Sequence, residues 1–394
     1  MAVTVGVPRE TFPGERRVAL TPRAVEALAK LGAGAIIEDS AGVEAGFSND
    51  LYTAKGARIA DRADVFAQAD IILQVRALGA NPEAGRPDVR LMRPGQIVIG
   101  FGEPLTAAPE IMELLRAGVS HFAMELVPRI TRAQSMDALS SMATIAGYHA
   151  VLMAAMTLPK MFPMLMTAAG TITAARALIL GAGVAGLQAI ATARRLGAVV
   201  SAYDIRSAVK EQIESLGATF VVLDIEAGGA EDKGGYAKAM GEDFYRRQRE
   251  LLTEVIREQD VLITTAAVPG KKAPILVTAE MASAMAPGSV IVDIAAERGG
   301  NCELTHPGET IVHHGINVMG PLNLPSTIPY HASQMYASNL VALLKLMVNK
   351  GELNMNREDE IIRETLVTFG KEVVNPRVSE ALGLTPVKQA GGGN

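Results

Sequence analysis

Short, uninterrupted apolar runs alternate with amphipathic segments along the first third of the chain. Between the runs, Thr21-Pro22 is typical of a helix start, Lys30-Leu31-Gly32 of a helix end, and residues 107–118 predict a further helix. Apolar runs without polar alternation indicate strands that are buried on both faces, so this region predicts a parallel β-sheet covered by helices. The predicted strands are residues 4–7, 35–39, 70–75, 96–101 and 120–125.

The middle of the chain repeats this alternation more regularly. Residues 176–206 have the pattern of a strand, a glycine-rich turn, a helix, a glycine stop and a second strand. Long helices predicted near 138–158 and 331–351 flank this region. We therefore predict an α/β protein of two Rossmann-like domains with parallel sheets, the second inserted into the first and joined to it by the long helices. The predicted first domain is 1–137 plus 322–394, and the second is 138–321, with further strands at 218–223, 260–265 and 289–294.

The segment from Ala138 to Leu158 contains no Asp, Glu, Lys or Arg, and the next charge is Lys160. Its length is close to the roughly 20 apolar residues that a membrane-spanning helix needs. It also contains Ser140, Thr144 and His149, so we expect a helix that is apolar on all sides because it is buried in a soluble protein. The first ten residues carry charge before an apolar segment forms, so no targeting segment is expected.

Composition narrows the classes of function. The net charge is −5 and the pI is about 5.8, and without a Lys/Arg-rich run a nucleic-acid or anionic-membrane surface is not expected. The sole cysteine, Cys302, rules out an internal disulfide and is typical of a reducing cytosol. His306, His313 and His314 lie near it, but adjacent residues in a strand point to opposite faces. We predict no metal site.

The sequence GAGVAG places Gly181, Gly183 and Gly186 in the G-x-G-x-x-G spacing. It follows a predicted strand and opens a predicted helix, which is the context that gives this motif its meaning. The first glycine permits the tight turn, the second lets a pyrophosphate approach the backbone, and the third lets the helix lie close to the strand. The helix N-terminus then faces the phosphates, so the motif predicts dinucleotide binding.

An acidic residue, Asp204, ends the second strand about twenty residues after the glycine turn. A carboxylate at this place accepts hydrogen bonds from the adenosine ribose and repels a 2′-phosphate, which favours NAD over NADP. Arg206 weakens this preference, because an arginine can accommodate the phosphate.

A polar cluster, RITRAQSMDALSS, stands at the head of the uncharged helix. We call residues 129–140 the polar fork. From the residues alone it is either a helix N-terminus with an acidic first turn and solvated arginines, or an active-site segment held by a buried helix.

Four stretches together resemble the proton-translocating NAD(P) transhydrogenases, specifically the peripheral NAD(H)-binding component that forms the first section of the alpha subunit. The resemblance runs from VGVPRE to about residue 345. The same fold occurs in alanine dehydrogenase, so the two must be distinguished. The stretches are GAGVAGLQAIATARRLGAVV, the polar fork, MFPMLMTAAGTI and KGGYAKAMGEDFYRRQ.

The resemblance implies that the polar fork lies beside the nicotinamide and holds the ring where hydride is transferred, with Arg129, Gln134, Asp137 and Ser140 as the catalytic residues. Positioning is the main contribution that a protein can make to a direct hydride transfer. Gln134 is expected to reach toward the second nucleotide. Residues 224–240 are expected to form a mobile lid over bound nucleotide. The implied cofactor-binding residues are Arg129, Arg132, Gln134, Asp137, Gly181, Gly183, Val184, Gly186, Asp204, Ile205, Arg206, Gly235, Tyr236, Gln248 and Ala267.

Alanine dehydrogenase is the first alternative. Arg17 matches the arginine that binds its substrate carboxylate, but its lysine and histidine fall at Arg76 and near Glu103. An arginine stays protonated and cannot serve as the acid or base of amino-acid oxidation. We therefore expect Arg17 to form a structural ion pair. The second alternative is a non-catalytic NAD(H)-binding module.

The resemblance finally implies a function that needs partners. The chain is expected to bind NAD(H), while NADP(H) is bound by a partner component and proton translocation occurs in separate membrane-domain subunits. It is expected to be a homodimer that is cytoplasmic and peripheral on the cytoplasmic side of the inner membrane. No nucleic-acid partner is expected.

Overall fold

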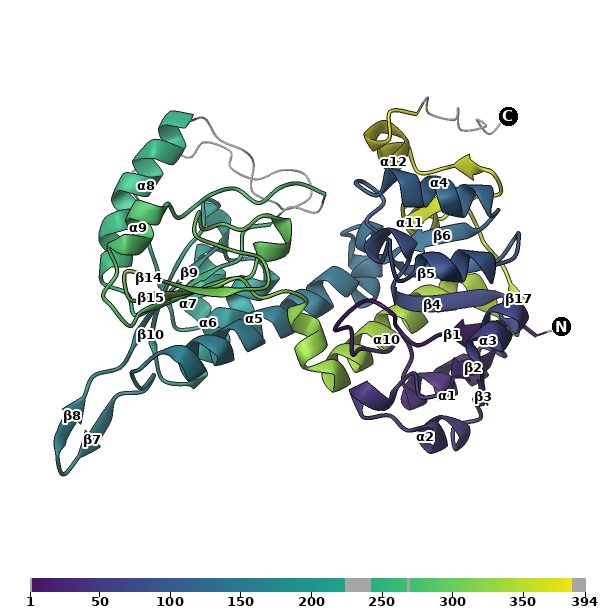
Figure 1. Cartoon of the computed structure of the whole chain (residues 1–394), viewed down its shortest axis with the longest axis horizontal. Coiled ribbons are helices and arrows are strands. Elements are labelled where there is room, and N and C mark those ends of the chain that lie inside the picture. Colours follow the sequence, from purple (N-terminus) through teal and green to yellow (C-terminus); the bar gives the residue numbers. More distant parts are fainter. Residues whose placement is uncertain (1, 224–241, 268–269, 385–394) are drawn as a thin grey trace. The chain divides into compact units, whose positions relative to one another are not determined.

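The computed structural model describes residues 2–223, 242–267 and 270–384. The chain divides into two units, the first comprising Met1–Met142 and Ser326–Asn394, and the second Ala143–Pro325. The chain leaves the first unit within helix α5 (Ala138–Thr157) and returns to it at the 3₁₀ helix η8 (Leu324–Thr327). Figure 1 labels the elements of both units.

Unit 1 contains an eight-stranded sheet in the order β19-β18-β6-β5-β4-β1-β2-β3. Its strands are β1 (Thr4–Val7), β2 (Gly34–Glu38), β3 (Arg58–Ala60), β4 (Ile71–Arg76), β5 (Ile97–Phe101), β6 (Ser120–Ala123), β18 (Leu366–Phe369) and β19 (Glu372–Val373). The first six pair in parallel, whereas β18 and β19 are antiparallel additions at one edge. Its helices are α1 (Pro22–Lys30), α2 (Asn49–Thr53), α3 (Arg62–Gln68), α4 (Ala108–Arg116), α10 (Pro329–Met347), α11 (Glu360–Thr365) and α12 (Pro376–Ala381), and β16 (Val348–Asn349) pairs with β17 (Glu352–Leu353).

Unit 2 contains a seven-stranded sheet in the order β11-β10-β9-β12-β13-β15-β14, parallel except for β14. Its strands are β9 (Arg176–Leu180), β10 (Val199–Tyr203), β11 (Thr219–Phe220), β12 (Val261–Thr264), β13 (Val290–Asp293), β14 (Thr310–His313) and β15 (Ile316–Met319). A separate hairpin is formed by β7 (Leu165–Thr167) and β8 (Gly170–Ile172). The helices are α6 (Val184–Arg195), α7 (Lys210–Ser215), α8 (Glu242–Arg257) and α9 (Ala279–Ser283).

Strand β9 shows why its sequence is apolar throughout. Ala177 and Ile179 belong to one core cluster, while Leu178 and Leu180 belong to another. Because successive side chains of a strand point to opposite faces, a strand covered on both faces has no position left for a polar residue. The predicted α/β class with two parallel-dominated sheets is confirmed, and the predicted strands agree within a few residues. The antiparallel edge strands β14, β18 and β19 were not predicted.

Helix α5 differs from its prediction. It is long and apolar enough to cross a membrane by length and composition, and 39% of its most apolar window is buried. Within unit 2 it contributes one face to the core, through Ala146, Ala150 and Ala154. Tyr148 and Met156 are 40% and 89% exposed. The prediction of a helix buried on all sides was therefore wrong, because in unit 2 this helix covers a core on one side only.

Candidate functional site

The glycine turn of unit 2 connects β9 to α6. Gly181 has a φ of +98°, which side chains rarely adopt, and its added Cβ would lie 2.6 Å from Thr265 Oγ1. Gly186 lies in the first turn of α6, where a Cβ would lie 1.9 Å from the carbonyl oxygen of Gly181. These two glycines are required by the fold itself, because one makes the turn and the other lets the helix approach it.

Gly183 has no such internal reason. It precedes the first residue of α6, and a Cβ added there would meet no atom within 4 Å. The open space lies at the N-terminus of a twelve-residue helix, where anions are stabilised by the helix dipole. Val184, the next residue, is 39% exposed. An exposed, side-chain-free approach to a helix N-terminus fits a pyrophosphate.

Asp204 follows β10 and is 8% exposed. Its Oδ2 accepts a hydrogen bond from the backbone amide of Ala182 at 2.8 Å, which fixes the glycine turn to the end of β10. Arg206 donates from Nε to Oδ1 at 2.9 Å and from Nη2 to Oδ2 at 2.7 Å. The structure therefore places Asp204 beside the turn as predicted, and pairs it with the arginine that was expected to modify its selectivity.

The remaining predicted residues of unit 2 lie at different depths. Ile205 is half-buried against a core cluster, and Ala267 is exposed after β12. Gln248 is 1% exposed and donates from Nε2 to the hydroxyl of Tyr203 at 2.8 Å. Its amide is thus engaged inside the unit. Gly235, Tyr236 and the predicted lid at 224–240 lie outside the described residues.

The polar fork belongs to unit 1 and contains the 3₁₀ helix η5 (Thr131–Met136) ahead of α5. Ala133 and Met136 are buried and anchor it, whereas Arg129, Arg132 and Gln134 are exposed. Because a 3₁₀ helix has three residues per turn, anchors three positions apart share one face. The segment therefore holds its polar side chains outward on a fixed backbone.

Asp137 and Ser140 interact directly. Asp137 Oδ1 accepts from the Ser140 amide at 2.8 Å, and Oδ2 from the Ser140 hydroxyl at 2.6 Å, so the carboxylate caps the start of α5. Arg132 forms a two-point ion pair with Asp359, at 2.6 and 3.1 Å. Asp137, Ser140 and Arg132 thus have structural roles, whatever else they bind, while the side chain of Gln134 forms no hydrogen bond among the described residues.

Arg17 forms the expected ion pair. Its Nε and Nη2 donate to the two carboxylate oxygens of Glu15 at 2.7 and 2.6 Å, and both side chains are almost fully buried. Arg76 donates from Nε to the same carboxylate at 3.2 Å, and its guanidinium lies 4.2 Å from the Phe12 ring centroid. The carboxylate-binding geometry of Arg17 is thus filled by the chain's own Glu15, and the structural interpretation of Arg17 is confirmed.

The histidines of unit 2 show no ligand geometry within the described residues. His313 and His314 contact each other edge to face, with ring centroids 4.3 Å apart. Cys302 is buried, and burial raises the pKa of its thiol to about 11. Within the described parts of the chain, no group of three His, Cys, Asp or Glu side chains is arranged to hold a metal ion.

Two family models match the chain. The N-terminal domain of alanine dehydrogenase/PNT matches residues 6–146, and the C-terminal domain of the same family matches residues 150–376. The chain is 46% identical to the first section of the NAD(P) transhydrogenase alpha subunit of Rhodospirillum rubrum, a separate polypeptide there, over 95% of this chain and 98% of that protein. The crystal structure of transhydrogenase from Sinorhizobium meliloti matches with a TM-score of 0.82 and 43% identity, over 95% of this chain and 99% of that one.

The two Rossmann-like units with a glycine turn define a dinucleotide-binding protein, and the chain belongs to the alanine dehydrogenase/PNT family. Within this family it is distant from alanine dehydrogenase itself. Identity to the Bacillus subtilis enzyme is 28%, over 96% of this chain and 94% of that protein. The similarity therefore favours the transhydrogenase alpha subunit over the dehydrogenase, in agreement with the resemblance seen in the sequence.

Proposed function

We propose that this chain is the NAD(H)-binding component of a proton-translocating transhydrogenase. The observation that carries the proposal is the glycine turn, in which Gly183 leaves an open approach to the N-terminus of α6. It is supported by 46% identity to a transhydrogenase alpha subunit over nearly the whole chain. The polar fork distinguishes this function from that of a passive nucleotide-binding module, which has no use for Gln134 beside a nicotinamide.

Each region of the chain has a proposed task. The N-terminal turn of α6 holds the pyrophosphate of NAD(H), and Asp204 to Arg206 bind the adenosine ribose, with Gly235, Tyr236 and Ala267 completing the site. Arg129, Gln134, Asp137 and Ser140 orient the nicotinamide. NADH supplies a hydride, which is two electrons and a proton. These side chains exchange no proton with it, so their contribution is orientation.

The acceptor is NADP⁺ held by a partner component, which becomes NADPH as NADH becomes NAD⁺. Proton translocation is assigned to separate membrane-domain subunits, and this chain is placed as a peripheral component on the cytoplasmic side of the inner membrane. No acid or base is needed in such a transfer, which agrees with Arg76 standing where alanine dehydrogenase has its lysine.

We also propose that the chain forms a homodimer through its nucleotide domain. The β7–β8 hairpin pairs with no other strand among the described residues and carries exposed apolar residues, with Met166 81% and Met164 55% exposed. An isolated two-stranded hairpin is marginally stable in water, so a second copy is the proposed cover. Met166→Asp is expected to convert the dimer to monomer in light scattering, with exposed Met156→Asp as a comparison on α5. A parent chain that is monomeric at micromolar concentration contradicts this proposal.

The function is tested by NADPH-driven reduction of an NAD analogue, with and without an NADP(H)-binding transhydrogenase partner. Turnover that requires the partner supports the proposal. Alanine-dependent reduction of NAD⁺ by the chain alone assigns it to the dehydrogenases, and NADH binding without either activity assigns it to non-catalytic modules.

A single substitution tests the polar fork. Gln134→Asn shortens the side chain by one methylene, so it is expected to lower hydride transfer at least tenfold while NADH affinity changes little. Exposed Gln212→Asn on α7 is the matched control and is expected to change neither. Equal losses of transfer and affinity in Gln134→Asn contradict a positioning role.

A further inference from the structure

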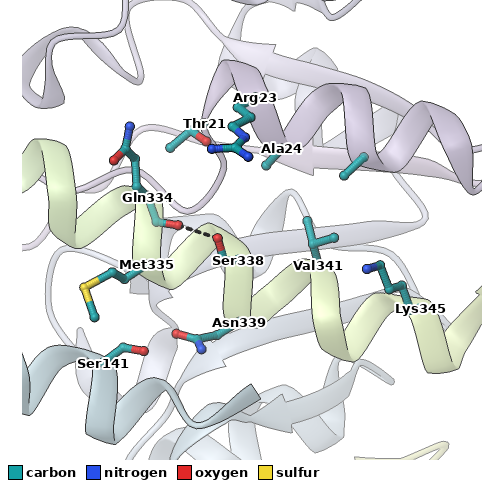
Figure 2. A pocket seen from close by; sticks show the side chains of 11 residues that line it. Thr21, Arg23, Ala24, Ser141, Gln334, Met335, Ser338, Asn339, Val341 and Lys345 are labelled. Atoms are coloured by element: carbon teal, nitrogen blue, oxygen red, sulfur yellow. Dashed lines mark hydrogen bonds between the residues drawn. The ribbon is translucent and has the colours of Figure 1, made fainter. Parts of the chain in front are cut away.

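Unit 1 carries a groove between α1 and α10 with a volume of about 560 Å³ (Figure 2). Its two cations, Arg23 on α1 and Lys345 near the end of α10, are exposed and have no ion-pair partner among the described residues. No Asp or Glu of the described chain contributes to the lining. The lining residues are Thr21, Arg23, Ala24, Ala27, Ser141, Gln334, Met335, Ser338, Asn339, Val341 and Lys345.

The N-terminus of α1 opens into this groove. Thr21 occupies the N-cap position but makes no side-chain hydrogen bond to the helix, and the next residue is Pro22, which has no amide hydrogen. The nine-residue helix α1 therefore has an N-terminus whose positive end is not satisfied by its own cap. An anionic group beside Arg23 would gain from both the guanidinium and the helix N-terminus.

A buried acceptor also lines the groove. Asn339 is 5% exposed and donates from Nδ2 to the Ser135 carbonyl at 2.9 Å, but its Oδ1 is buried without a hydrogen-bond partner among the described residues. Such an atom costs free energy until a donor reaches it. Ser338 uses its hydroxyl hydrogen on the Gln334 carbonyl at 2.8 Å, as drawn in Figure 2, which leaves its oxygen as a second acceptor.

The lining thus requires anionic ends and a middle that donates hydrogen bonds. From Ser338 to Lys345, α10 rises about 10 Å, which is the span of a small molecule with a charged group at each end. A volume of about 560 Å³ is in the range of metabolite-binding sites. Ala24 and Val341 offer apolar contacts to a carbon chain between the ends.

We propose that this groove binds a small bisphosphorylated polyol, with one phosphate at Arg23 and the N-terminus of α1, the other at Lys345, and a hydroxyl donating to Asn339 Oδ1. Bound ligand contacts the polar fork indirectly, because Ser141 donates to the Asp137 carbonyl at 3.2 Å and Asn339 to that of Ser135. The ligand therefore restrains the backbone of that segment.

The test is calorimetric titration of the full chain with fructose 1,6-bisphosphate, in the presence of saturating NADH so that the glycine turn is occupied. The expected result is saturable one-to-one binding with a Kd at or below about 1 mM. Arg23→Ser and Lys345→Ser are each expected to weaken binding about tenfold. Arg90→Ser, which removes another exposed arginine of unit 1, is the matched control and is expected to have no effect.

Two results overturn the proposal. One is the absence of saturable binding at about ten times the expected Kd. The other is equal affinity in the parent, Arg23→Ser and Lys345→Ser, which assigns the binding to another surface. Titration with inorganic phosphate separates the two-ended site from a single anion site, because equal affinity for phosphate and bisphosphate contradicts recognition of both ends.

Discussion

The buried ion pair between Glu15 and Arg17 provides the sharpest test of how unit 1 is held together. Glu15→Gln keeps the size and one acceptor oxygen of the side chain but removes its charge. Arg17 and Arg76 then lose the carboxylate that neutralises them both. The side chains of Arg17 and Glu15 are 3% and 0% exposed, so water cannot replace the lost partner.

The expected cost follows from that burial. Breaking a buried pair by removing one partner costs about 3–5 kcal/mol of unfolding free energy, because an uncompensated charge remains. For a unit of about 210 residues this lowers the melting temperature by roughly 10 °C. Glu15→Gln combined with Arg17→Met removes the stranded charge as well, and is expected to recover much of the loss.

Calorimetric melting of the parent and the variants measures the effect. Lys55 and Glu26 form a pair at the same 2.6 Å separation but with side chains 42% and 48% exposed, so Glu26→Gln is the matched control and is expected to change the melting temperature little. Equal melting temperatures for Glu15→Gln and Glu26→Gln would refute the argument from burial. A double variant less stable than Glu15→Gln would refute the argument from stranded charge.

Two further predictions concern the glycine turn and a buried carboxyl. Gly186→Ala is expected to destabilise the protein by several kcal/mol in denaturant unfolding, since its Cβ lies 1.9 Å from a carbonyl oxygen, whereas Gly183→Ala is expected to leave stability nearly unchanged but to weaken NADH binding in fluorescence titration. Burial raises the pKa of Glu125 from 4.5 to about 7. The folded state therefore holds this proton where the unfolded state has lost it, and stability falls as the pH rises between these values. Melting temperatures measured between pH of about 5 and about 8 should fall less in Glu125→Gln.

The fold could be predicted where a local rule is also the global one. Thr21-Pro22 and Lys30 give the bounds of α1, and the apolar runs give the parallel strands, because strands buried on both faces must be apolar throughout. Strand β18 could not be predicted in this way. It begins at Leu366, directly after α11, and its place beside β6 depends on Thr368, whose hydroxyl bonds the backbone of His121 and Val119. Such a long-range pairing leaves no periodic signal.

The candidate site could be predicted as residue types but not as contacts. The glycine spacing predicted the turn, yet only the structure separates Gly183 from Gly186, which differ in what a Cβ would meet. The fork was predicted to be polar and exposed. Its 3₁₀ helix and the hydrogen bonds from Ser140 to Asp137 depend on local geometry that polarity alone does not specify.

The contacts of Asp204 make cofactor preference hard to evolve one step at a time. Its carboxylate fixes the amide of Ala182 and neutralises Arg206, so replacing it alone would disturb the turn that grips the pyrophosphate and release a cation. A lineage or an engineer seeking to exchange NAD for NADP must therefore change the acid and its neighbours together. Single-residue libraries at this position are expected to lose binding of both nucleotides before any variant gains the phosphorylated one.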